Sequence, residues 1–69
     1  MTYATKNQIL QVATKYQSVG RDYRGQMYAV AADGKKVKFN TYLYIDSLHN
    51  LAIEGKMTYN EEDWTYSAK

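Results

Sequence analysis

Residues 27–45 place the tightest limit on the fold of this chain. Two runs in which apolar and polar residues alternate flank the dipeptide Asp33-Gly34, which is the strongest short-range signal for a tight turn between antiparallel strands. A two-residue turn there sets Ala32 opposite Lys35, and counting back along both arms fixes which side chains share a face. The sequence therefore predicts a hairpin with this register.

The predicted register sorts the hairpin and the residues beside it into two unlike faces. One face is apolar enough to be a core face, and it comprises Tyr28, Val30, Val37, Phe39, Leu43 and Ile45. The other mixes aromatic, basic and small residues, namely Tyr23, Met27, Ala29, Lys36, Lys38, Asn40, Tyr42 and Tyr44. Because the second face resembles neither an ordinary core nor an ordinary solvated surface, the functional interpretation rests on it.

An amphipathic helix is predicted ahead of the hairpin, over residues 6–19. Thr5 and Gln8 have the spacing of a capping box. The apolar residues that follow at helical spacing are Ile9, Val12, Ala13, Tyr16 and Val19. Gly20 stands where a residue in the left-handed conformation would end the helix.

Residues 46–55 fit two templates. Read as a helix, the segment is capped by Asp46 or Ser47 and ends at Gly55. Read as a strand, its apolar residues alternate with polar ones on either side of Gly55. We favour the strand, followed by a polar turn over 60–63 and a last short strand over 64–66.

These elements predict one α+β domain over residues 1–69, with one N-terminal helix packed on a three- or four-stranded antiparallel meander sheet. The residues expected in its core are Ile9, Val12, Tyr16, Val30, Val37, Phe39, Leu43, Ile53 and Trp64. A chain of 69 residues without cysteine must spend most of its apolar residues on that core or share a core with a second copy. A homodimer is therefore one expectation.

The composition argues against several kinds of location and chemistry. No apolar run reaches the ~20 residues that cross a bilayer, and the N-terminus lacks a secretory pattern, so we expect a cytoplasmic protein that contacts no membrane. One histidine, His49, no cysteine and no phosphate-binding glycine loop lead us to expect no enzymatic activity, no cofactor and no metal site. The acidic run 61–63 is interpreted as a solvated turn, with a weak cation site as the alternative.

The second hairpin face and the turn before it form the candidate binding site. Its residues are Tyr23, Arg24, Met27, Lys36, Lys38, Tyr42 and Tyr44. Tyrosine, arginine and methionine are enriched in protein interfaces, and lysines suit the polar rim. We therefore predict a small non-catalytic inhibitor or regulator that binds another protein, a profile typical of bacteriophage and mobile-element accessory proteins.

Two alternatives remain open for the same face. Single-stranded nucleic acid or a nucleotide could stack on the tyrosines beside the lysines, although a net charge of +2 gives this binding little electrostatic support. The face could also be purely structural, because cross-strand tyrosine pairs stabilise ordinary sheets.

Overall fold

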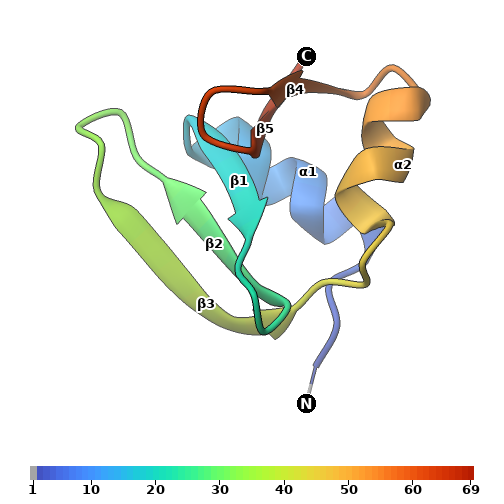
Figure 1. Ribbon diagram of the computed structural model, residues 1–69, viewed down its shortest axis with the longest axis horizontal. Coiled ribbons are helices and arrows are strands. Elements are labelled where there is room, and N and C mark those ends of the chain that lie inside the picture. The colour runs from blue at the N-terminus through green and yellow to red at the C-terminus, as the bar shows by residue number, and fades with distance from the viewer. Residues whose placement is uncertain (1) are drawn as a thin grey trace.

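The computed structural model describes residues 2–69, which form two helices and a five-stranded antiparallel sheet (Figure 1). The elements are α1 (Lys6–Lys15), β1 (Ser18–Arg21), β2 (Gln26–Val30), β3 (Lys36–Tyr42), α2 (Ser47–Ile53), β4 (Met57–Asn60) and β5 (Thr65–Ala68). In space the strands are ordered β3-β2-β1-β5-β4. The predicted α+β class and antiparallel sheet are confirmed, with more strands than expected and a second helix. Neither helix within 2–69 has the length and apolar character needed to cross a membrane.

Helix α1 begins where the sequence predicts and ends earlier. The Gln8 backbone N–H donates to Thr5 Oγ1 over 3.2 Å, and the Thr5 N–H donates to Gln8 Oε1 over 2.9 Å, which completes the capping box. The prediction that the helix continues to residue 19 is wrong, because Tyr16 is already extended and residues 18–21 form β1.

Gly20 is a strand residue and does not end a helix. It pairs with Tyr28 of β2, and a Cβ on Gly20 would lie 2.4 Å from Cζ of the Tyr28 ring. That separation is far below van der Waals contact. The tyrosine ring thus covers Gly20, and a side chain at this point in β1 would require the ring to move.

The β2–β3 hairpin forms, but its turn is one residue longer than predicted. The Ala31 N–H donates to the Lys35 carbonyl and the Gly34 N–H donates to the Ala31 carbonyl, each over 2.9 Å. Ala31, and not Ala32, thus faces Lys35 across a three-residue loop in which Gly34 has φ 88°. A turn followed by a left-handed glycine is a common way to build such a loop.

This one-residue shift exchanges the two faces of β2 and leaves those of β3 as predicted. Met27 and Ala29, expected on the binding face, are 3% and 0% exposed in the core. Tyr28 and Val30, expected in the core, are only partly buried and lie on the opposite face. Ala29 pairs with Val37, so the core side of β3 carries the apolar residues that the sequence assigns to it.

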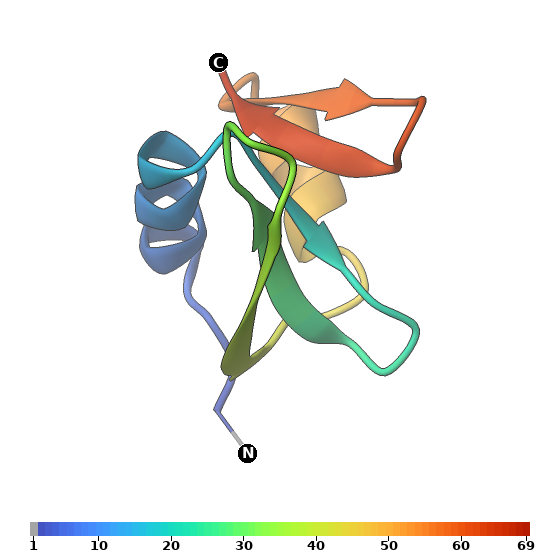
Figure 2. The ribbon, with the colours of Figure 1, turned by 90° about the vertical axis from the view of Figure 1, so that its left-hand side faces the viewer.

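The core lies between one face of the sheet and the two helices. Figure 2 shows α1 to the left of the strands and α2 behind them. The buried cluster comprises Ala4, Ile9, Ala13, Val19, Met27, Leu43, Leu48, Leu51 and Met57. Partly buried residues packed against it include Val12 and Phe39.

The preference for a strand over residues 46–55 is wrong, because this segment contains α2. Leu48 and Leu51 share one helix face and are 6% and 0% exposed, while Gly55 follows the helix with φ 80°. A helix turns Ile53 away from the core, so this residue is 69% exposed rather than buried. Trp64, also expected in the core, is 75% exposed in the turn between β4 and β5.

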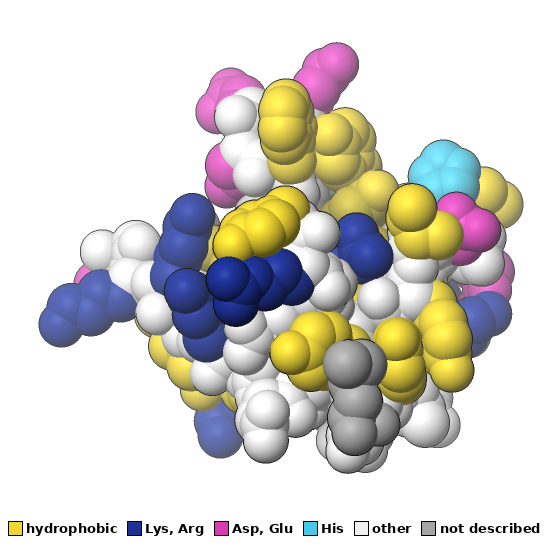
Figure 3. Space-filling view, turned by 60° about the horizontal axis from the view of Figure 1, so that its bottom comes forward, with side chains coloured by type: hydrophobic (Ala, Val, Ile, Leu, Met, Phe, Trp, Pro, Cys, Tyr) yellow, Lys and Arg dark blue, Asp and Glu magenta, His cyan; other side chains and the backbone are white. Residues whose placement is uncertain are grey.

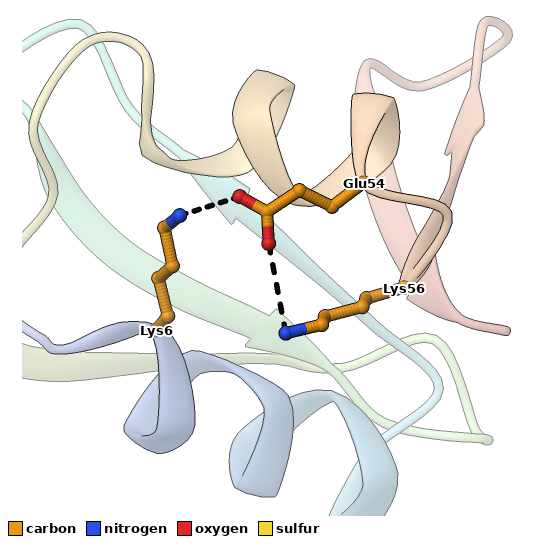
Figure 4. Close-up of polar contacts among 3 residues, drawn as sticks. All are labelled: Lys6, Glu54 and Lys56. Carbon is orange, nitrogen blue, oxygen red and sulfur yellow. Dashed lines mark hydrogen bonds and ion pairs between the residues drawn. The ribbon is translucent and has the colours of Figure 1, made fainter.

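An exposed ionic group links α1 to the end of α2 (Figure 4). The Glu54 carboxylate accepts a hydrogen bond from Lys6 Nζ and lies 3.6 Å from Lys56 Nζ. The hydrogen bond from Lys6 and the charges of both lysines lower the pKa of Glu54 below its ordinary value of 4.5. These are the two ion pairs within residues 2–69. The lysines of the β2–β3 hairpin therefore have no acidic partner within 4 Å in this part of the chain.

Candidate binding surface

A short N-terminal arm, residues 2–4, brings Tyr3 to the end of β3. The Tyr42 N–H donates to the Thr2 carbonyl over 2.8 Å, and the Ala4 N–H donates to the Tyr42 carbonyl over 3.0 Å. The Tyr3 ring then stacks on Tyr44, with centroids 4.2 Å apart and planes inclined by 15°. It also lies 6.3 Å from the Tyr42 ring, so three aromatic rings meet here.

The turn between β1 and β2 carries Tyr23 and Arg24. Asp22 shapes this turn, because its Oδ1 accepts the backbone N–H groups of Arg24 and Gln26 over 2.9 and 2.8 Å. Arg24 Nε donates to Tyr23 Oη over 2.9 Å, and the guanidinium carbon lies 5.3 Å from the tyrosine ring centroid. The two side chains therefore form one unit.

Leu43 joins this turn to the end of β3. Its backbone N–H donates to the Gly25 carbonyl over 2.7 Å, and its carbonyl accepts from Arg21 Nε over 3.1 Å. Since the side chain of Leu43 is also in the core, both segments are fixed by buried structure. We call the group that they present the tyrosine cluster: Tyr3, Tyr23, Arg24, Tyr42 and Tyr44.

The tyrosine cluster is largely open to solvent. Tyr23 is 86% exposed, Tyr44 is 63% exposed and Tyr3 is 40% exposed. Figure 3 views the molecule from this end and shows hydrophobic side chains near the centre of the face, with Lys and Arg side chains gathered on its left. Acidic side chains lie toward the top and right of the same view.

The two lysines of the predicted site lie at the other end of β3. Lys36 and Lys38 are exposed on the face opposite the core. Lys36 Nζ lies 5.2 Å from the Tyr28 ring centroid, and Lys38 pairs with Tyr28 across the hairpin. At about 3.3 Å per strand residue, Lys36 and Tyr42 are roughly 20 Å apart. The predicted site is therefore split into the tyrosine cluster and a lysine pair around Tyr28, and buried Met27 belongs to neither.

A polar hollow of about 590 Å³ adjoins the acidic turn. Its lining residues are Gln17, Ser18, Val30, Tyr59, Asn60, Glu61, Glu62, Asp63 and Ser67. The Thr65 hydroxyl donates to Asp63 Oδ1 over 2.7 Å, so this carboxylate shapes its own turn.

Burial raises the pKa of the Tyr28 phenol, and the negative charges of Asp63 and Asp22 raise it further. Within residues 2–69 no three His, Cys, Asp or Glu side chains form a group that could hold a metal ion.

A second, more apolar hollow lies over α2 and the last hairpin. Its volume is about 510 Å³, and it is lined by His49, Ala52, Ile53, Tyr59 and Tyr66. The Tyr59 and Tyr66 rings lie 4.9 Å apart. The strand interpretation of residues 46–55 concealed this surface, because it turned Ile53 inward.

Sequence reasoning missed Tyr3 and Tyr28 as residues of the candidate surface. Tyr3 belongs to a short arm without periodicity, and its contact with Tyr42 joins segments nearly forty positions apart. Tyr28 was assigned to the core by the turn length alone. A three-residue loop at Asp33-Gly34 places Tyr28 opposite the core, but the turn residues fit this loop and the two-residue loop equally well.

Comparisons of the chain with protein-family models, curated proteins and solved structures found no match.

Proposed function

We propose that this protein binds another protein through the tyrosine cluster and acts as a non-catalytic inhibitor or regulator. The observation that carries the proposal is the exposed stack of Tyr3 on Tyr44, at 4.2 Å, on a segment that the Leu43–Gly25 hydrogen bond joins to the turn of the Tyr23–Arg24 pair. Tyrosine and arginine are the residues that most often dominate the binding energy of protein interfaces. Tyr23 and Tyr44 add little to the core at 86% and 63% exposure, so a structural role accounts poorly for them.

The backbone around the cluster supports the same proposal. Tyr42 holds the arm by donating to Thr2 and accepting from Ala4, and Leu43 holds the β1–β2 turn by donating to Gly25 and accepting from Arg21. A surface that is already ordered loses less conformational entropy when a partner binds. A small regulator that covers a partner's surface, as bacteriophage and mobile-element accessory proteins do, fits this arrangement. We place it in the cytoplasm, where a chain without cysteine needs no oxidising compartment.

A second candidate is the binding of single-stranded nucleic acid at the lysine pair. It is favoured by one observation, the position of Lys36 Nζ 5.2 Å from the Tyr28 ring with Lys38 beside it. A base stacked near Tyr28 would have two lysines within reach of its phosphates. The acidic residues 61–63 and the pKa-raising charge of Asp63 near Tyr28 oppose this binding.

Site-specific photo-crosslinking tests the first proposal. A photoreactive phenylalanine analogue at position 44 is compared in cells with the same analogue at position 58, an exposed residue of β4. We expect position 44 to give a discrete protein adduct that position 58 does not give. The adduct protein is then purified, and its affinity is measured with wild type, Tyr44→Ala, Tyr23→Ala and the control Thr58→Ala.

A tyrosine that dominates an interface contributes about 2 kcal/mol or more, or roughly 30-fold in Kd. Tyr44→Ala and Tyr23→Ala should each weaken the complex by this factor, and Thr58→Ala should not. Equal adducts at both positions, or unchanged affinity in the tyrosine variants, would contradict the proposal. An adduct removed by nuclease would favour nucleic acid, and one of twice the chain mass would identify a homodimer interface.

A further inference from the structure

We propose that the free edge of β3 is a strand-addition site for an extended acidic peptide segment of a partner protein. Strand β3 is the outermost strand at its end of the sheet, so among residues 2–69 no strand lies beside the outer edge of its backbone along Lys36 and Lys38. This inference goes beyond the proposed function. It concerns the sheet edge and not the tyrosine cluster, and it holds whether or not that cluster binds a protein.

The direction of the backbone groups follows from the hairpin hydrogen bonds. The carbonyl of Lys35 and the N–H of Leu43 both bond toward β2 and its preceding turn. In an antiparallel pair, successive residues direct their N–H and C=O groups alternately toward and away from the partner strand. Lys36 and Lys38 are therefore the residues whose backbone donors and acceptors point out of the sheet.

The chain itself pairs an extended segment with this edge at one position, through the isolated bridge between Tyr3 and Tyr42. The Tyr42 N–H and carbonyl point away from β2, and both bond to the N-terminal arm, at Thr2 and Ala4. Tyr42 lies an even number of residues from Lys36 and Lys38, on the same outward set. The arm occupies the edge at Tyr42, and the sheet order leaves the rest of that edge unpaired.

The side chains around the edge define the chemistry of the occupant. Residues of an added strand alternate between the two faces of the sheet. On the core side they would meet a hollow of about 250 Å³ between the arm, α1 and β3, lined in part by Val12 and Phe39. On the other side they would lie beside Lys36 and Lys38, which have no acidic partner within 4 Å among residues 2–69.

The complementary occupant is thus a segment in which small apolar residues alternate with Asp or Glu. The same lysines oppose pairing between two β3 edges, because like charges opposite each other destabilise a sheet. A second copy of this chain is therefore a poor occupant, and an acidic strand is a good one.

The test uses a capped octapeptide that alternates Val with Glu, titrated into the full-length protein labelled with nitrogen-15. We expect the backbone amides of Lys36 and Lys38 to exchange with solvent at least tenfold more slowly in the complex. Lys38→Pro should weaken peptide binding at least tenfold, because it removes an outward N–H that the folded sheet does not use. Lys38→Ala is the matched control that removes the charge and keeps the N–H, so it should weaken binding less than Lys38→Pro.

A chemically synthesised chain with an N-methyl group at Lys38 keeps the test decisive if the proline variant does not fold. It should lose binding as the proline variant does. Equal binding by these variants and wild type would overturn the proposal, as would shifts confined to residues 42–44. Protection of the two amides without peptide, increasing with protein concentration, would identify self-pairing and overturn it. Protection by oligothymidine but not by the peptide would overturn it in favour of nucleic acid. Tyr23→Ala, which leaves the stack of Tyr3 on Tyr44 intact, should bind the octapeptide as wild type does, so failure at the edge and failure at the tyrosine cluster are distinguishable.

Discussion

The contact between Gly20 and the Tyr28 ring provides a direct test of the packing on the face opposite the core. An alanine Cβ at position 20 would lie 2.4 Å from Cζ and 2.5 Å from Oη of Tyr28. Non-bonded carbon atoms are most stable at about 3.5–4.0 Å. The ring must therefore move by roughly 1 Å or more, and it would leave its position 5.2 Å from Lys36 Nζ.

We expect Gly20→Ala to lower the free energy of unfolding by about 1–2 kcal/mol. Moving the ring loses the cation–π contact with Lys36, worth roughly 0.5–1 kcal/mol, and crowding on this partly exposed face adds about 1–2 kcal/mol, the lower part of the range for over-packed cores. Alanine returns about 0.5–1 kcal/mol, because glycine loses more backbone entropy than alanine when a strand forms. In a domain of this size each kcal/mol lowers Tm by about 4–8 °C.

A double-mutant cycle with Tyr28→Ala, followed by urea and thermal denaturation, measures the contact. Without the ring, Gly20→Ala should become neutral or stabilising by about 0.5–1 kcal/mol, so the coupling free energy should be on the order of 2 kcal/mol. Gly34→Ala is the matched control. Its φ is 88° and its Cβ would meet no atom within 4 Å, so its cost of about 1–2 kcal/mol arises from the backbone and should add to that of Tyr28→Ala. If the effects of Gly20→Ala and Tyr28→Ala on the free energy of unfolding were also additive, the contact between Gly20 and the Tyr28 ring would be refuted.

Two further predictions concern the acidic turn and the start of α1. The pKa of Tyr28 is raised by burial and by the charges of Asp63 and Asp22. The neutral phenol therefore contributes its full stabilisation at pH values below the unfolded-state pKa of about 10. This contribution is lost as the pH rises through the pKa of the folded state. Asp63→Asn keeps an acceptor for the Thr65 hydroxyl and should lower the pKa of Tyr28. This pKa is measured from phenolate absorbance, with Tyr28→Phe as the reference, and an unchanged titration of Tyr28 would contradict the prediction. Thr5→Ala should reduce the free energy of unfolding by about 0.5–2 kcal/mol in denaturation experiments, and a loss no greater than that of the exposed control Thr2→Ala would refute the capping role.

The features that the sequence predicts correctly are those set by neighbouring residues. The capping box at Thr5 needs only Gln8, and the hairpin needs only a turn between two alternating runs. The end of α1 depends instead on distant contacts, because residues 16–19 continue the helical pattern and yet Ser18 and Val19 pair with β2. Hydrogen bonds in a sheet that already holds β2 outweigh a weak local preference for four more helical residues.

The candidate surface was predicted in part for the same reason. Tyr42 and Tyr44 follow from the predicted alternation, which holds through Leu43. The prediction that Ile45 lies on the core face is wrong, because β3 ends at Tyr42 and Ile45 is 77% exposed. Met27 was misplaced by the turn, and Tyr3 reaches the cluster only through its pairing with Tyr42. Residues 46–55 were ambiguous because two leucines three apart suit one helix face, while Gly55 fits either a helix end or a strand.

The register of the hairpin is decided by β1 and not by the turn residues. Asp33 and Gly34 suit a loop of two or three residues equally well, because each kind of loop uses a left-handed glycine and a side-chain acceptor. In this structure Asp33 Oδ1 accepts the Lys35 N–H. Pairing with β1 distinguishes the two. On the core side Val19 faces Ala29, and both are 0% exposed beneath the helices, a position that a tyrosine would overfill.

On the opposite side β1 offers Gly20, whose missing side chain is the space that the Tyr28 ring occupies. The small residue of β1 and the large residue of β2 therefore match in one register only, and that register requires the longer loop. It follows that Gly20 favours the register in which Tyr28, and not Ala29, pairs with Lys38. The chemistry of the surface opposite the core is thus set by a residue that the sequence alone assigns to the end of a helix.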